Sequence, residues 1–116
     1  MIKNGRPYTD ENGYVDDRLI TDLPQDVQDT VMKWIRERIV PRKTVLHGKT
    51  SYGLKHLLER DTNIYLSNNE FKDAMMICGY EPHDPNRLNW EYAISRKSPC
   101  FKGSIMKING VEILLG

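Results

Sequence analysis

The chain has 116 residues, of which 39% are hydrophobic and 28% are charged, and its formal net charge is +1. This length allows one domain and excludes most multidomain enzymes. The composition is too apolar for a disordered chain. The sequence also lacks a run of about 20 apolar residues, which a membrane-spanning helix needs. Because no apolar stretch follows the first charged residues, we expect no signal peptide, no contact with a membrane and a cytoplasmic location.

The charge is distributed unevenly along the chain. Residues 1–30 carry seven acidic and three basic residues, whereas residues 31–60 carry eight basic and two acidic residues. Such a polarised chain can present a basic face although its total charge is small. Alternatively, the acidic N-terminal part simply neutralises the basic middle of the chain.

Residues 1–22 form the first unit in chain order. Gly5, Pro7 and the pair Asn12-Gly13 are interleaved with tyrosines here, and Asn-Gly is a strong turn signal. We expect an extended arm or a short hairpin over residues 1–22, followed by a single domain over residues 23–116.

The first helix is predicted over residues 24–40. An apolar stripe runs from Val27 to Ile39 at helical spacing, and Pro41 ends the helix. Residues 41–50 then form a basic connector whose charged side chains should face the solvent.

Two more helices follow, over residues 51–61 and 68–78. The second has the clearer local pattern, because Ser67 and Glu70 have the spacing of a capping box. Gly79 supplies the left-handed position that ends this helix.

β-Structure is predicted after the helices. Residues 88–95 alternate apolar and polar side chains as a strand does, and residues 104–108 and 111–115 flank an Asn-Gly hairpin turn. The predicted fold class is therefore α+β, with a three-helix, helix-turn-helix-like core followed by a strand and a C-terminal hairpin. This is the order of elements in a winged helix. The apolar residues of the hairpin could also pair across a homodimer edge, and they are Ile105, Ile108, Val111, Ile113 and Leu115.

The segment from Tyr65 to Tyr80 reads YLSNNEFKDAMMICGY. It resembles the S-N-x-x-F-x-x-A-M-x-x-x-G-Y segment of winged-helix modules in phage and plasmid replication proteins. A longer string, from Ser51 through Tyr80 to Asn89-Trp90, is similar to small proteins encoded by phages and mobile elements of low-GC bacteria. The resemblance covers roughly residues 50–95 and implies DNA binding inside a bacterial host cell. Because a helicase or primase domain is lacking, it implies stand-alone binding rather than replication.

A recognition helix at residues 68–78 would turn Asn68, Asn69, Lys72, Asp73 and Met76 outward. Asparagine can pair with adenine, and lysine can reach guanine or phosphate. Acidic residues on the same helix would repel phosphates, so a merely solvated helix face is the alternative. Other cations could neutralise the nucleic-acid backbone, and we assign Arg36, Arg42, Lys43, Lys49, Lys55 and Lys97 to this role.

The N-terminal arm favours a second function from a different class. Tyr8, Tyr14, Asp16 and Asp17 would make an adaptable contact surface for a host protein. Small phage proteins of this size include inhibitors of host defence nucleases, such as anti-CRISPR proteins. The alternative function is therefore a protein that docks on a host defence nuclease or a host replication complex, with the winged helix as a scaffold.

Signals for catalysis are weak. His47, His56 and His83 lack metal-ligand spacing among themselves or with the two cysteines. The glycines are scattered at turns and caps rather than gathered in a phosphate-binding loop. We expect a non-enzymatic protein that needs no metal and no cofactor.

Overall fold

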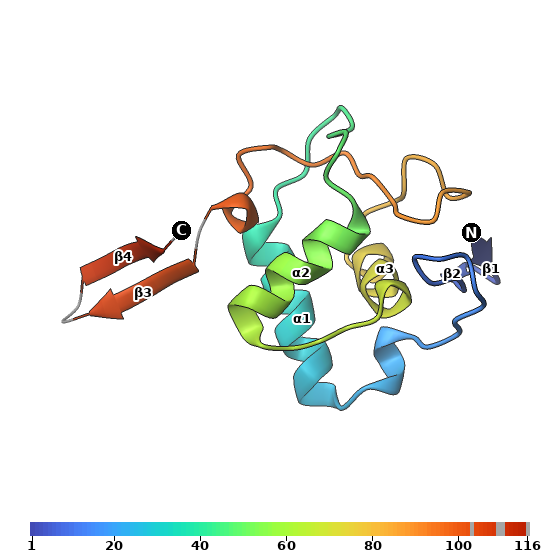
Figure 1. Cartoon of the computed structure of the whole chain (residues 1–116), viewed down its shortest axis with the longest axis horizontal. Coiled ribbons are helices and arrows are strands. Elements are labelled where there is room, and N and C mark those ends of the chain that lie inside the picture. The colour runs from blue at the N-terminus through green and yellow to red at the C-terminus, as the bar shows by residue number, and fades with distance from the viewer. Residues whose placement is uncertain (103, 109–110, 116) are drawn as a thin grey trace.

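The computed structural model describes residues 1–102, 104–108 and 111–115, with side chains described through residue 102. It is a small α+β fold with three helices and a C-terminal two-stranded antiparallel sheet (Figure 1). Among the described residues the strands and α-helices are β1 (Ile2–Lys3), β2 (Arg6–Pro7), α1 (Gln25–Arg38), α2 (Ser51–Thr62), α3 (Asn68–Ile77), β3 (Ser104–Ile108) and β4 (Val111–Leu115), and two short 3-10 helices lie at Ile20–Asp22 and Pro99–Phe101.

The three predicted helices are confirmed, with small changes at their ends. The helix α1 ends at Arg38 because Ile39 already has an extended backbone, two residues before the predicted end. The helix α2 ends where Asn63 adopts the left-handed conformation at φ 60°. Local backbone preferences thus set the helix boundaries as the sequence pattern indicated.

The capping box of α3 is confirmed in detail. The Ser67 hydroxyl accepts a hydrogen bond from the Glu70 N–H at 3.1 Å, and the Ser67 N–H donates to the Glu70 carboxylate at 2.7 Å. At the other end Gly79 has φ +92°, and the Tyr80 N–H donates to the Met75 carbonyl. These caps satisfy backbone groups that a helix leaves unpaired at its ends.

All three helices contribute to one hydrophobic core. Apolar side chains that are at most 5% exposed come from α1, α2 and α3, from the segments before and between these helices, and from the chain after them. The most deeply buried include Val31, Ile35, Leu54, Leu58, Phe71, Met75, Trp90, Tyr92 and Ile94.

The strand predicted over residues 88–95 is wrong as secondary structure, although its inward face is right. Trp90, Tyr92 and Ile94 are fully buried, as the alternation predicted. The segment is extended but pairs with the connector only at isolated bridges, Pro41 with Ile94 and Thr50 with Glu91. A continuous ladder does not form because the connector turns between these two points.

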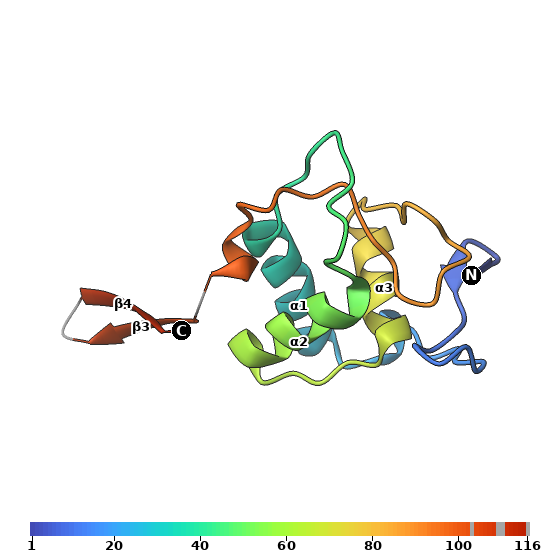
Figure 2. The ribbon, with the colours of Figure 1, turned by 45° about the horizontal axis from the view of Figure 1, so that its top comes forward.

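The N-terminal arm is folded as two successive hairpin turns. The strands β1 and β2 pair through Ile2–Pro7 and Lys3–Arg6, and a bridge joins Thr9 to Val15. Figures 1 and 2 both place this arm beside α3.

The C-terminal hairpin is also confirmed. Its register pairs Ile108 with Val111, as a two-residue connection requires. The side chains invoked for a homodimer edge lie outside the described side chains. In Figure 1 the hairpin lies on the far side of α1 and α2 from α3, so it does not stand beside the predicted recognition helix. Within the described ranges, no helix has the length and apolar character to cross a membrane.

Candidate functional site

The structure buries the polar side of α3 that was predicted to face DNA. Asn68, Asn69, Lys72 and Asp73 are all 0% exposed, and Met76 is half-buried. The expectation that these side chains point into solvent is therefore wrong. The physical reason is that the N-terminal arm and the loop before Trp90 cover this side of the helix.

An ion pair holds the arm against α3. The Arg6 guanidinium donates two hydrogen bonds to Asp73, from Nε at 2.5 Å and from Nη2 at 2.6 Å. The same carboxylate accepts the backbone N–H of Ile20 at 3.0 Å. Asp73 therefore holds both ends of the arm against α3. Its negative charge is compensated by the Arg6 guanidinium within the fold.

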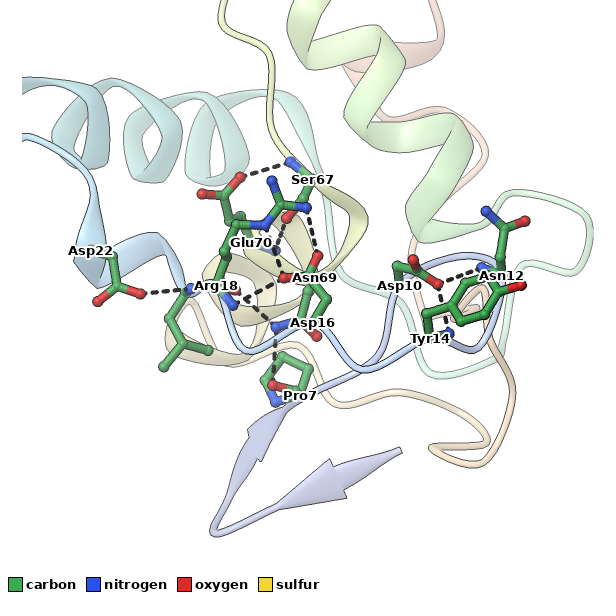
Figure 3. Close-up of polar contacts among 11 residues, drawn as sticks. Pro7, Asp10, Asn12, Tyr14, Asp16, Arg18, Asp22, Ser67, Asn69 and Glu70 are labelled. Carbon is green, nitrogen blue, oxygen red and sulfur yellow. Dashed lines mark hydrogen bonds and ion pairs between the residues drawn. The ribbon is translucent and has the colours of Figure 1, made fainter.

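The two asparagines of α3 also hold neighbouring segments against the helix. The Asn69 side chain donates to the carbonyl oxygens of Pro7 at 3.0 Å and Arg18 at 2.8 Å (Figure 3). The Asn68 side chain donates to the carbonyl of Leu88 and the side chain of Asn89. The amide nitrogens that could have paired with adenine thus donate to the arm and to the loop before Trp90 instead.

Lys72 is buried against an aromatic ring. Its Nζ lies 4.6 Å from the centre of the Trp90 ring, and among the described residues it has no hydrogen-bond partner. Burial lowers the pKa of Lys72 to about 8. A lysine in this position cannot reach a nucleic acid unless the arm moves.

The arm residues predicted to contact a protein are only partly available. Tyr14 is 73% exposed and Asp17 is exposed, whereas Tyr8 is half-buried. Asp16 is buried and accepts two hydrogen bonds from the Arg18 guanidinium at 2.9 Å (Figure 3). This pairing lowers the pKa of Asp16 below its usual value. Of the four residues predicted to contact a protein, Tyr14 and Asp17 therefore offer exposed side-chain surface.

Two acid-free segments of the chain lie side by side, as Figures 1 and 2 show for the connector and the chain that follows Glu91. The sequence has no Asp or Glu between Glu37 and Glu59, or between Glu91 and Glu112. Backbone hydrogen bonds of 2.8–3.0 Å join the two segments, from Arg42 to Ala93, from Leu46 to Tyr92 and from Ser95 to Val40.

This pairing gathers cations from distant parts of the chain. Lys43, Lys49, Arg96, Lys97 and Lys102 are exposed, and the Arg42 guanidinium donates to carbonyl oxygens of its own loop. Among residues 1–102, none of the six forms an ion pair with a carboxylate. We call this group the basic edge: Arg42, Lys43, Lys49, Arg96, Lys97 and Lys102.

Two predicted phosphate contacts lie elsewhere. Arg36 is exposed in the last turns of α1. Lys55 is only 4% exposed, and its Nζ lies 5.1 Å from the Tyr52 ring centre and 5.0 Å from that of Tyr65. Lys55, assigned to a phosphate contact from the sequence, is therefore largely covered, with its ammonium group between the two tyrosine rings.

Sequence reasoning missed Arg96 and Lys102. Both follow Glu91 in a stretch without acidic residues, and that absence was the signal that could have indicated them. Their proximity to the connector depends on long-range pairing, which no local pattern contains.

One carboxylate borders the basic edge. Glu91 accepts the Gly48 N–H at 2.6 Å and lies 3.1 Å from His47 Nδ1. The hydrogen bond from Gly48 and the contact with His47 lower the pKa of Glu91. Glu91 therefore stays ionised at neutral pH and holds the turn of the connector.

The cysteines lack the surroundings of a nucleophile. Burial raises the pKa of Cys100 to about 11 and also raises the pKa of Cys78. In the part of the chain that the structure describes, no group of three His, Cys, Asp or Glu side chains is placed to hold a metal ion.

Comparison with known proteins gives no match: no protein-family model, no curated protein and no solved structure is significantly similar to this chain.

Proposed function

We propose that the protein binds the phosphate backbone of a nucleic acid through the basic edge. The observation that carries the proposal is the pairing of two acid-free segments, which gathers six cations that have no carboxylate partner among residues 1–102. Lys and Arg that are not neutralised within a fold can release condensed counterions when they bind phosphates. This release favours binding without any need for base recognition.

The contact surface differs from that of a winged helix-turn-helix with α3 in the major groove. The helix α3 uses Asn69 and Asp73 to hold the arm, and Lys72 lies against Trp90. A cation that already has a carboxylate partner adds little to phosphate binding, whereas none of the six cations of the basic edge has one among residues 1–102, and all of them except Arg42 are exposed. The proposal therefore assigns α3 to the scaffold.

The test is fluorescence anisotropy with labelled DNA at about 50 and 200 mM salt. We expect the affinity to fall at least tenfold across this range. A variant with Lys43, Arg96 and Lys97 changed to alanine should lower the slope of log affinity against log salt by about 2–3, because each phosphate contact contributes about 0.9. These three side chains are exposed and form no side-chain hydrogen bond among the described residues, so the fold should be kept.

The matched control changes Lys3, Lys33 and Arg87 to alanine. These residues are also exposed, and the net charge changes by the same amount. The control should retain the wild-type slope within about one contact. An equal loss in both variants would reduce the effect to total charge and contradict a defined basic edge. No binding at about 50 mM salt would refute the proposal.

A second candidate function, docking on a host protein, is favoured by one observation. Tyr14 and Val15 are 73% and 79% exposed and adjacent at the second turn of the arm. Asp10 fixes this turn by accepting the N–H groups of Asn12 and Tyr14. An exposed aromatic side chain on an ordered turn is a typical anchor of protein interfaces.

The two candidates can be separated by their variants. Tyr14→Ser should abolish association with a host partner in a pull-down and leave DNA affinity unchanged. The triple variant of the basic edge should lower DNA affinity and leave the association with a host partner unchanged.

A further inference from the structure

We propose that a hollow beside the first turn of α2 binds one base of a single-stranded nucleic acid. This inference rests on the proposed function and specifies its ligand. The hollow has a volume of about 330 Å³, which lies at the lower end of the range for small-molecule sites. It is lined by Lys49, Tyr52, Gly53, Leu54, Leu57 and Phe101, together with the backbone around Thr50.

The walls of the hollow suit an aromatic, uncharged group. Leu54, Leu57 and Phe101 supply apolar surface, and the half-buried Phe101 ring packs against the hydrophobic core. Nucleobases stack on such rings, and each stacked base contributes about 1–3 kcal/mol. In a duplex the bases are stacked on one another, so only an unpaired base can enter a side pocket of this kind.

The charge around the hollow suits the phosphate that a base carries with it. Lys49 belongs to the basic edge, and its Nζ lies 5.5 Å from the centre of the Phe101 ring. Lys102 follows Phe101 directly and is exposed. No acidic residue lines the hollow among the residues described. A strand that follows the basic edge would therefore bring its backbone to Lys49 and a base to Phe101.

Gly53 has no structural reason to be glycine. It lies inside α2 with ordinary helical backbone, and a Cβ built on it meets no atom within 4 Å. Glycine in a helix costs roughly 0.5–1 kcal/mol relative to alanine. Neither a positive φ nor close packing requires this glycine, and because it lines the hollow, a large side chain at position 53 would occupy space there.

The test compares a short labelled oligothymidylate with a duplex of the same length. We expect the wild type to bind the single strand at least about fivefold more tightly, as one stacked base predicts. Gly53→Leu fills the hollow without changing the charge, and it should lower single-strand affinity to the level of the duplex. Phe101→Leu keeps apolar packing and removes the ring, and it should have the same direction of effect.

The matched control is Thr30→Leu, which adds a similar side chain at an exposed position of α1 that does not line the hollow. It should leave both affinities within about twofold, and its melting temperature and that of Gly53→Leu verify folding. Duplex affinity should stay within about twofold of wild type in all three variants, because phosphate contacts are unchanged.

The outcomes separate this inference from the proposed function. Equal affinity of the wild type for both nucleic acids, or a preference that survives Gly53→Leu, overturns the hollow as a base site and leaves phosphate binding intact. Thymidine monophosphate that competes as well as the oligonucleotide would assign the hollow to a free nucleotide and also overturn it. Absence of salt-dependent binding to either nucleic acid refutes the proposed function itself.

Discussion

Arg6 and Asp73, which are 67 positions apart, form a two-point ion pair between the N-terminal arm and α3. The Asp73 side chain is 0% exposed and the Arg6 side chain is 37% exposed. The ion pair therefore joins a buried carboxylate on α3 to a partly exposed guanidinium on the arm. This hydrogen bonding to Asp73 also raises the pKa of Arg6 above its usual value. The arm is therefore an integral part of the domain rather than an appendage.

Loss of this ion pair should destabilise the fold measurably. Among the described residues, Arg6→Ala leaves the buried Asp73 carboxylate with the Ile20 N–H as its remaining hydrogen-bond partner, and we expect a loss of about 2–4 kcal/mol in the free energy of unfolding. Urea denaturation followed by circular dichroism measures this loss. The exposed Arg87, 3.9 Å from Asp84, is the control, and Arg87→Ala should cost less than about 0.5 kcal/mol. If Arg6→Ala costs no more than the small loss expected for Arg87→Ala, the contact between the arm and α3 contributes little to the free energy of unfolding.

Replacement of Lys72 should stabilise the protein in a pH-dependent way. Burial lowers the pKa of Lys72 from 10.5 to about 8, so the charged form is disfavoured in the fold. Below pH 8 the wild type therefore carries a penalty that Lys72→Met removes, and we expect a gain of about 1–3 kcal/mol at pH 7.

The gain from Lys72→Met should shrink as the pH rises. Between pH 8 and 10.5 the unfolded chain binds more protons at Lys72 than the folded chain, so the wild type gains stability relative to the variant. Comparison of the two proteins is essential, because the raised pKa values of Cys100 and Tyr80 act in the opposite direction over this range. Denaturation of both proteins at pH 7 and pH 10 tests it, and a constant difference would contradict a buried charged lysine.

Removal of the carboxylate beside the basic edge should strengthen nucleic-acid binding. Glu91→Gln keeps an oxygen for the Gly48 N–H but removes a negative charge that repels phosphate. A charge at about 4 Å in water is worth about 1 kcal/mol, so affinity should rise about two- to fivefold at low salt. Anisotropy at two salt concentrations measures the change, and Glu81→Gln, an exposed position in the loop before Trp90, is the control. A fall in affinity would place the nucleic acid elsewhere.

The same substitution at two glycines should have opposite effects on stability. Gly53→Ala should stabilise the protein by about 0.5–1 kcal/mol, because the helix backbone is ordinary and a Cβ meets open space. Gly79→Ala should destabilise it by about 1 kcal/mol or more, because φ is +92° at the end of α3. Thermal melting of the two variants, measured side by side, distinguishes these signs. Destabilisation by Gly53→Ala would mean that the glycine has a structural role after all.

Much of the fold could be predicted because its signals are local. The Ser67–Glu70 capping box and the left-handed Gly79 set the ends of α3 from contacts within a few residues. The apolar alternation after residue 88 identified Trp90, Tyr92 and Ile94 as buried, although it could not show that their neighbour provides only isolated bridges.

The candidate site was less predictable, because long-range contacts decide it. Local periodicity indicated which side of α3 carries Phe71, Ala74 and Met75, and by elimination turned the polar side outward. Nothing near Asp73 in the sequence shows that Arg6, which lies 67 positions away in the N-terminal arm, will pair with its carboxylate. The basic edge likewise exists only because the chain after Glu91 returns to the connector.

The burial of α3 is unusual in its continuity, since every residue from Leu66 to Met75 is buried. An ordinary surface helix alternates between constrained and permissive positions with each turn. In a saturation mutagenesis screen for folded protein, this segment should instead appear as a nearly continuous block of intolerance, with apolar replacements of Lys72 as the exception. A map of tolerated substitutions would therefore show little helical periodicity over residues 66–75. In such a map this part of α3 would look like a central helix that is packed on all sides, not like a surface helix with one exposed face.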